Sequence, residues 1–294
     1  MKQGAMKRRM RTLVWAGVVA ALTILGIPSS AQAEVDVAGW EFKDMSAHGI
    51  SVPMTFDLAF DEERVAWVRV VDGRPDIYLT DLKSGAETQL TDSTAWKRVV
   101  ALEGEQVAWI EYAGSDWLSD STIWLKDLTS EEPARALVTA KVALDSRLVL
   151  AGDYLAWVQY DPYPGGAGVR PALYLQHVNT GAVVRISDTI ITGVNSNEGD
   201  KAFDLTTTHL AYVEQVPEED ARVMLYDLAA GERQELGRVP RATEHVDLEG
   251  DLLTWSQADE TADHEHANTR IFIHRPSTGE TTLVASAPIF RTYP

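Results

Sequence analysis

The stretches Val65-Ala66-Trp67-Val68, Val107-Ala108-Trp109-Ile110 and Leu155-Ala156-Trp157-Val158 are three copies of one pattern. The pattern returns in looser form as Leu210-Ala211-Tyr212-Val213 and Leu253-Thr254-Trp255-Ser256. Its aromatic positions lie 42, 48, 55 and 43 residues apart. A repeat of this length is typical of a four-stranded blade in a β-propeller. The sequence therefore predicts an all-β chain that folds as a β-propeller, with five four-stranded blades.

Turn residues divide each copy into short strands. The first copy holds four segments in which apolar residues alternate with polar or β-branched ones: 56–60, 65–71, 76–82 and 87–91. The turns Asp72-Gly73 and Lys83-Ser84-Gly85 separate the last three, as expected for antiparallel hairpins. Glu131 breaks the glycine pattern of the later turn in the second copy. The other copies keep that glycine, at Gly85, Gly181, Gly231 and Gly279, and the third strands carry Tyr78, Trp124, Tyr174, Met224 and Phe272.

The first 33 residues have the composition of a secretory signal peptide. Basic residues between Lys2 and Arg11 precede an apolar run over residues 13–26, and Ala31-Gln32-Ala33 follows as a small-residue cleavage site. The apolar run is shorter than the roughly 20 residues that span a bilayer, which disfavours the alternative of an uncleaved anchor. We therefore expect cleavage after Ala33, export to the periplasm or the extracellular space, and no membrane span in the mature chain.

The predicted domain organisation follows from the leader and the repeat. Residues 34–53 form an N-terminal segment and a candidate ring-closing strand, and residues 54–294 form the propeller domain. One of the two ends is expected to pair with the opposite terminal blade. A sixth blade would need about 40 further residues, so five blades are favoured.

The charge and the cysteine content exclude several classes of partner and cofactor. Without the leader the chain keeps all 44 acidic residues and 21 of the 26 basic ones, which makes it strongly acidic. Such a surface repels phosphate backbones, so no nucleic-acid partner is expected. The chain has no cysteine, and so neither disulfides nor thiolate ligands.

The first copy also carries a family resemblance. Asp76-Ile77-Tyr78-Leu79-Thr80-Asp81-Leu82-Lys83-Ser84-Gly85, followed by Gln89-Leu90-Thr91, resembles the repeat of the TolB-like, WD40-like β-propeller family. Residues 223–231 are a looser copy, and the resemblance covers roughly residues 54–286. The Pro-Asp-Gly turn of the family is replaced, for example by Glu103-Gly104-Glu105. The resemblance implies the fold, and we expect neither the extra domain of TolB proteins nor the hydrolase domain of propeller peptidases in this chain.

The inner strands supply the first candidate site. Seven positions before the aromatic residue every copy is apolar, which predicts a core between blades: Phe60, Leu102, Leu150, Leu205 and Leu248. Eight or ten positions before the aromatic residue, every copy except the second carries an acidic or basic residue. Val99 stands at the tenth position of the second copy. We expect this other face to gather around the central channel Asp57, Arg147, Asp204, His245 and Asp247. Carboxylates beside a cation bind metals or work as an acid and a base, whereas a wet channel or an ion pair of Arg147 with an aspartate is the structural alternative.

Two loops are weaker candidates for a divalent cation, and no other cofactor is expected. His264 and His266 point the same way if their segment is extended, and imidazoles with carboxylates bind Zn²⁺. Residues 195–200 are rich in oxygen ligands, but Thr206 stands where a calcium loop has its bidentate glutamate. A polar hairpin tip and an ordinary turn between blades are the alternatives.

The connection between the second and third strands predicts a working rim. Its length, measured between the two aromatic positions, is 11, 15, 17, 12 and 17 residues in the five copies. Aromatic side chains on such tips stack on sugars or anchor protein partners, unless they pack against neighbouring blades. The candidate binding residues on this rim are Tyr112, Trp117, Tyr160 and Tyr163, with Arg147 and His245 on the inner strands.

These observations favour an exported, non-enzymatic propeller that binds a protein or a polysaccharide of the cell envelope. No nucleophile elbow, zinc-protease motif, phosphate loop or dinucleotide fingerprint is present. The alternative is a carboxylate-dependent glycoside hydrolase or lyase that uses Asp57, Asp204 and Asp247. A third possibility is a structural module that a cation stabilises.

Overall fold

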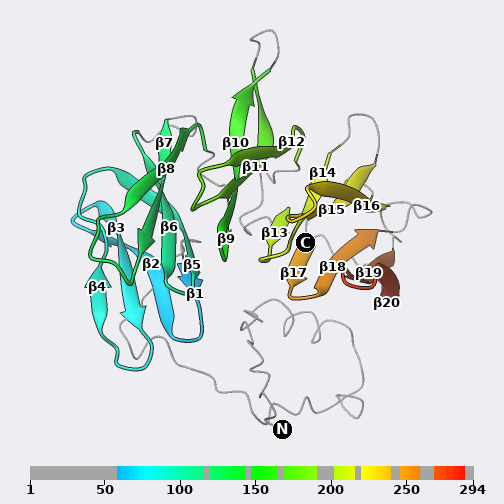
Figure 1. Ribbon diagram of the computed structural model, residues 1–294, viewed down its shortest axis with the longest axis horizontal. Coiled ribbons are helices and arrows are strands. Elements are labelled where there is room, and N and C mark those ends of the chain that lie inside the picture. Colours follow the sequence, from blue (N-terminus) through cyan, green and yellow to red (C-terminus); the bar gives the residue numbers. More distant parts are fainter. Residues whose placement is uncertain are drawn as a thin grey trace, which may run out of the picture.

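The five predicted repeats form five antiparallel sheets. The computed structural model describes residues 58–114, 120–142, 147–163, 168–190, 202–215, 220–239, 246–258 and 268–288. Within these ranges each sheet has four strands that pair in chain order. Figure 1 shows the five sheets as blades in an arc, with the first and the last at its two ends. The chain is thus a five-bladed, all-β propeller, as its sequence predicts.

The strands are, in blade 1, β1 (Leu58–Phe60), β2 (Arg64–Val71), β3 (Arg74–Asp81) and β4 (Glu87–Gln89); in blade 2, β5 (Trp96–Glu103), β6 (Gln106–Tyr112), β7 (Ser121–Asp127) and β8 (Arg135–Ala140); in blade 3, β9 (Leu148–Ala151), β10 (Tyr154–Pro162), β11 (Val169–His177) and β12 (Val183–Ser187); in blade 4, β13 (Phe203–Leu205), β14 (His209–Glu214), β15 (Ala221–Asp227) and β16 (Glu232–Val239); in blade 5, β17 (Val246–Glu249), β18 (Leu252–Ala258), β19 (Asn268–Arg275) and β20 (Glu280–Pro288). The described residues include no helix, and so none that is long and apolar enough to cross a membrane.

The aromatic positions of the repeat meet directly across the second and third strands. Trp157 pairs with Tyr174 in blade 3, and their rings stack with centroids 5.6 Å apart. Trp255 and Phe272 stack in the same way in blade 5, at 5.2 Å. The same register joins Trp67 to Tyr78, Trp109 to Trp124 and Tyr212 to Met224.

Each inner blade buries both faces of its sheet against its neighbours. We call the side toward the next blade in the sequence the forward face and the opposite side the back face. The core between blades 2 and 3 joins Ala108 and Ile110, on the forward face of blade 2, to Leu155 and Trp157 on the back face of blade 3. The cores between blades 1 and 2, 3 and 4, and 4 and 5 are built in the same way, from an alanine and a branched apolar residue of one blade and an aromatic residue of the next. A tryptophan or tyrosine on one blade therefore packs over the alanine of the blade before it.

In blades 2, 3 and 4 the fourth strand adds an apolar residue to the forward core through a β-bulge. In blade 3, Tyr174 pairs with Arg185 and Leu173 with Ser187, so Ile186 has no partner across the strand. The Ile186 side chain is buried in the core between blades 3 and 4. The same shift occurs beside Leu137, Leu236 and Val284.

Aspartate side chains hold the turns between the third and fourth strands. The Oδ1 atom of Asp81 accepts hydrogen bonds from the backbone N–H groups of Lys83 and Ser84, at 3.1 and 2.6 Å. Asp227 does the same for Ala229 and Ala230, both at 2.8 Å. These bonds to the ionised carboxylate lower the pKa values of both aspartates. The predicted glycines of these turns have the expected left-handed φ angles, from +70° to +74°.

The turn of blade 2, which lacks the glycine, uses a lysine instead. The Nζ atom of Lys126 donates to the carbonyls of Asp127 and Glu132, at 2.8 and 2.7 Å, and also to that of Ser130. The Oδ1 atom of Asp127 accepts from the Thr129 hydroxyl and backbone N–H, which lowers its pKa. The ammonium group therefore donates hydrogen bonds to the backbone carbonyls of a turn in which no residue has a left-handed φ angle.

The aspartate turns predict an acid-sensitive stability. Because the folded-state pKa of Asp127 lies below its ordinary value, its contribution is complete above the unfolded-state pKa and is lost as the pH falls through the folded-state pKa. We expect Asp127→Asn to keep the turn bonds but to flatten the fall in unfolding free energy between about pH 5 and about pH 2. Urea titrations at several pH values measure this, with the exposed Asp92→Asn as control; an unchanged pH dependence in Asp127→Asn would contradict the interpretation.

Candidate functional site

The hairpins between second and third strands lie at one end of every blade and define a rim. We call this end, formed by the β2–β3, β6–β7, β10–β11, β14–β15 and β18–β19 connections, the hairpin rim. The opposite end, formed by the turns between first and second and between third and fourth strands, is the turn rim. Because each blade is an antiparallel meander, the inner strands begin at the hairpin rim.

Among the described residues of the hairpin rim, two aromatic side chains are exposed. Trp96, at the start of β5, is 50% exposed, and Tyr163, directly after β10, is 47% exposed. Val70 and Val71 at the end of β2 are exposed beside the junction of blades 1 and 2. Tyr163 is one of the predicted binding residues, whereas Trp96 was not singled out because it precedes the repeat motif. Large aromatic side chains exposed to this extent are characteristic of contact sites rather than of the core.

The hairpin that carries Tyr163 is braced by a polar network at its base. Asp161 accepts a 2.6 Å hydrogen bond from the Tyr174 hydroxyl and a 2.7 Å bond from Gln159, and it forms a 3.1 Å ion pair with Arg185. Burial raises the pKa of Tyr174 to about 12, and the bond to Asp161 acts in the same direction. Tyr174 therefore stays a hydrogen-bond donor at any physiological pH. The network fixes the orientation of β10 and β11 below the tip.

Two of the predicted rim aromatics are not available to a partner. Tyr112 is 1% exposed and belongs to the core between blades 2 and 3. Tyr160 is also buried, and its backbone N–H donates to the carbonyl of Lys141. Tyr112 ends β6 and Tyr160 lies within β10, and because both side chains are buried, their assignment as exposed binding residues is wrong. The alternative that rim aromatics pack against a neighbouring blade applies to Tyr112.

The inner-strand charges form a contact between blades. Arg147 donates to Asp204 Oδ1 at 3.1 Å and to the Phe203 carbonyl at 2.6 Å. Asp204 Oδ2 accepts from the backbone N–H of Leu248 in blade 5, at 3.0 Å. Asp204 is buried on the forward face of blade 4, and both of its oxygens are engaged. The structure brings Arg147 and Asp204 together, and Asp204 links blades 3, 4 and 5.

The remaining predicted residues have varied positions. Asp247 is half-buried on β17, and its carbonyl accepts from the Thr254 hydroxyl at 3.5 Å. Among the described residues there is no group of three or more histidine or acidic side chains arranged for a metal ion. The other predictions fall outside the described residues: Asp57, Trp117, His245, His264 and His266.

A β-bulge in blade 2 changes the alignment of its inner strand. Val100 pairs with Trp109 and Arg98 with Ile110, so the register shifts by one residue at Val99. Val99 has a φ angle of +54°, which is strained for a β-branched residue. Counting ten positions back from Trp109 therefore selects the bulged residue, and Arg98 takes the equivalent place. A single extra residue is invisible to an alignment by fixed spacing.

A buried ion pair between blades 1 and 2 was not found from the sequence. The Nζ atom of Lys97 is fully buried and lies 3.0 Å from Asp76 Oδ1. It also donates to the carbonyls of Ser93 and Ala95. Asp76 in turn accepts from Thr91 at 3.1 Å. Lys97 stands next to Trp96, so this pair fixes the strand end that presents the exposed indole.

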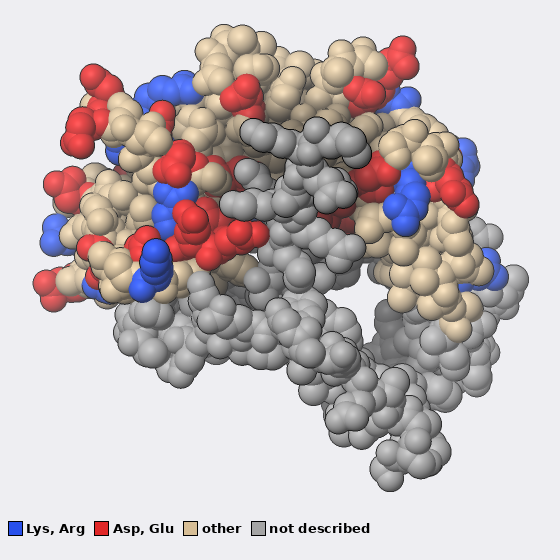
Figure 2. Space-filling view, turned by 60° about the horizontal axis from the view of Figure 1, so that its bottom comes forward, with Lys and Arg blue, Asp and Glu red and all other residues tan. Residues whose placement is uncertain are grey.

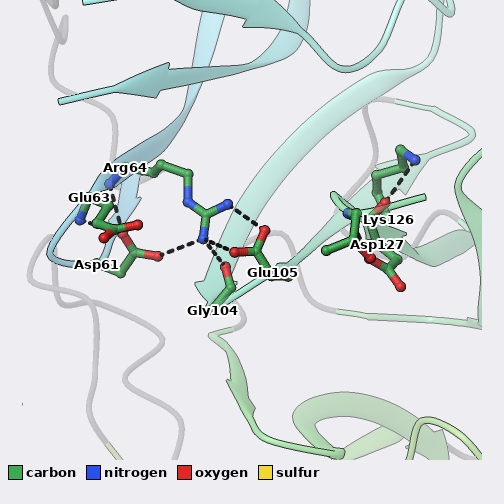
Figure 3. Close-up of polar contacts among 8 residues, drawn as sticks. Asp61, Glu63, Arg64, Gly104, Glu105, Lys126 and Asp127 are labelled. Atoms are coloured by element: carbon green, nitrogen blue, oxygen red, sulfur yellow. Dashed lines mark hydrogen bonds and ion pairs between the residues drawn. The ribbon is translucent and has the colours of Figure 1, made fainter. Parts of the chain in front are cut away.

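The turn rim is also held by charges between blades. Arg64 of blade 1 donates to both carboxylate oxygens of Glu105, at 2.8 and 3.1 Å, and to the carbonyl of Gly104 at 2.7 Å (Figure 3). Asp61 adds an ion pair at 3.6 Å. The pKa of Arg64 is raised and that of Glu105 is lowered, in both cases chiefly by their mutual hydrogen bonds. These contacts join blades 1 and 2.

Comparison with known proteins places the chain by fold alone. No protein-family model matches the sequence, and no curated protein matches it. Dipeptidyl peptidase 4 of Porphyromonas gingivalis matches 76% of the chain at 12% identity and a TM-score of 0.51, over 38% of its own length. TolB from Acinetobacter baumannii matches 80% at 16% identity and a TM-score of 0.47. An oligogalacturonate lyase in complex with manganese matches 76% at 13% identity and a TM-score of 0.41, over 74% of its own length.

The chain therefore resembles TolB-like β-propellers in fold. It spans 54% of the TolB chain, so the match covers about half of that protein. At 12% identity the dipeptidyl peptidase match concerns the fold alone, and a fold does not select one activity.

The contacts of Asp204 predict a structural effect of its removal. In Asp204→Asn the charge that pairs with Arg147 is lost, and an NH2 group that cannot accept a hydrogen bond replaces one of the two accepting oxygens. We expect a loss of about 1–3 kcal/mol in unfolding free energy. Chemical denaturation measures it, with the exposed Asp92→Asn as the matched control. Native stability in Asp204→Asn combined with a lost glycan-cleaving activity would instead support the hydrolase or lyase alternative.

The buried pair predicts strong coupling between Lys97 and Asp76. Asp76→Leu leaves a buried ammonium group without its carboxylate, so we expect a destabilisation of about 3–5 kcal/mol. Lys97→Met is expected to destabilise for the converse reason, and Asp76→Leu combined with Lys97→Met to recover most of the loss. A double-mutant cycle by urea denaturation measures the coupling. Single variants that each cost under about 1 kcal/mol would show that the pair is not essential.

Proposed function

We propose that this protein is an exported, non-enzymatic β-propeller that binds a protein or a polysaccharide of the cell envelope through its hairpin rim. The observation that carries the proposal is the exposure of Trp96 and Tyr163 on the same rim. Each aromatic side chain has a rigid support, Trp96 beside the Lys97–Asp76 pair and Tyr163 on the braced β10–β11 hairpin. Rigid exposed aromatics lose little conformational entropy on binding and act as anchors.

The charge of the chain supports a neutral or basic partner. The formal charge is −18 for the whole chain, and acidic side chains gather on the face seen in Figure 2. Such a surface repels anionic lipid and nucleic acid. The basic and apolar segment before Ala33 supports export, after which the rim would meet its partner in the periplasm or outside the cell.

The contacts of the inner strands weigh against the hydrolase or lyase alternative. A general acid or nucleophile needs a carboxylate that reaches the substrate. Asp204 is buried between blades, and its oxygens already accept hydrogen bonds from Arg147 and Leu248. Structural use of this carboxylate favours the binding function.

The proposal is tested by partner capture with rim variants. The processed protein is immobilised and exposed to envelope extracts, and bound protein and carbohydrate are both analysed. We expect Trp96→Ala and Tyr163→Ala each to weaken capture about tenfold or more, with little change in melting temperature. Leu252→Ala is the matched control, because Leu252 is an exposed apolar residue at the turn rim. If both rim variants capture the same material as the native protein and as the control, the proposed function is wrong.

A further inference from the structure

The forward face of blade 5 differs in composition from the other forward faces. In blades 1 to 4 the second strand presents an alanine and a branched apolar residue, all of them buried, as Ala66 and Val68 do in blade 1. Thr254 and Ser256 occupy these positions in blade 5 and are partly exposed. The next residue across the sheet is Ile271, paired with Ser256 and 43% exposed. Its counterparts are all fully buried: Ile77, Ile123, Leu173 and Val223.

The bulged residue of the fourth strand shows the same difference. Ile186 in blade 3 is 1% exposed, and Leu137 and Leu236 are partly buried against their cores. Val284, the bulged residue of β20, is 55% exposed. It lies next to Ala285, the partner of Ile271 across the strand. Ile271 and Val284 therefore form an apolar patch that lacks the cover found in the other blades.

Blade 1 does not supply that cover among the described residues. The core cluster on its back face contains Trp67 and Tyr78 but no described residue of blade 5. The guanidinium group of Arg69 lies 4.6 Å from the ring centre of Trp67 and 4.2 Å from that of Tyr78, and it pairs with Glu87. A charged side chain thus closes this face, as a polar outer surface does at the end of a repeat array.

The chain before β1 has the length and the side chains to cover the patch. Residues 34–57 are 24 residues long and lead directly into blade 1, at the end of the arc opposite blade 5 (Figure 1). An extended segment of this length reaches about 80 Å, which is ample for the span of one blade. Trp40 and Phe42 are two positions apart, so they face the same side in an extended segment. The other forward faces are each covered by a tryptophan or tyrosine of the next blade.

We propose that residues 34–53 dock on the forward face of blade 5 in the same molecule, with Trp40 and Phe42 against Ile271 and Val284. The hydroxyls of Thr254 and Ser256 are placed to bond to the backbone of the docked segment. This contact takes the place of a blade-to-blade core between blades 5 and 1. It is independent of the rim function proposed above.

The absence of cysteine from the chain makes the contact directly measurable. Val284→Cys introduces a single thiol on the patch, and Val184→Cys introduces one on β12, where Val184 is 45% exposed. The protein is produced with its own leader and purified after processing, and maleimide labelling rates are compared. We expect Cys at 284 to react about tenfold or more slowly than Cys at 184. Adding Trp40→Asp and Phe42→Asp should raise the rate at 284 to that at 184.

Three results would overturn the proposal. The first is an equal labelling rate for the two thiols in the otherwise native chain. The second is a slow labelling rate at position 284 that the Trp40→Asp and Phe42→Asp changes leave unaltered. The third is a labelling rate at position 284 that falls as the protein concentration rises, which would indicate that a second copy covers the patch. Ile271→Cys provides a second probe if Val284→Cys fails to fold, as judged by circular dichroism. Partner capture through the rim should be retained in Trp40→Asp, which separates failure of this inference from failure of the proposed function.

Discussion

The structure depends on one packing constraint: a four-stranded blade has two apolar faces, and each must be buried against another blade. The solution is a repeated fit in which the ring of Trp109, Trp157, Tyr212 or Trp255 covers the alanine of the preceding blade. Burying 150–250 Å² per aromatic side chain contributes on the order of 4–6 kcal/mol each by area, an upper estimate. In a chain without disulfides these cores hold the blades together.

The same constraint determines the role of the charged residues in the strands. Asp204 and Lys97 are located where neighbouring blades meet, so a charge there is either paired or strongly destabilising. Asp204 is bound by Arg147 and the Leu248 backbone, and Lys97 by Asp76. Residues that resemble catalytic carboxylates in the sequence therefore act as connections between blades. The exposed aromatic side chains Trp96 and Tyr163 lie at the ends of the blades instead.

The two ends of the blades are built differently. The turn rim is closed by aspartate turns and by the Arg64–Glu105 contact, so its polar groups bond mainly to each other. The hairpin rim varies in length from blade to blade and exposes Trp96 and Tyr163 above firm supports. Regular turns suit a structural edge, whereas variable hairpins on a rigid scaffold suit recognition. At the end of the arc, blade 5 presents Thr254 and Ser256 where its neighbours present buried apolar residues.

The sequence by itself determined the all-β class, the number of blades and the aromatic positions of the second and third strands, because these follow from short-range periodicity and from turns that require glycine. It also marked Arg147 and Asp204 as partners and Tyr163 as a rim residue. Only the tertiary structure decided that Tyr112 is buried, that Val99 is bulged and that Lys97 meets Asp76. The physical reason is that burial and charge pairing depend on which side of a strand meets the next blade. One inserted residue moves the following side chains to the other side of the strand, and an alignment by fixed spacing does not detect it.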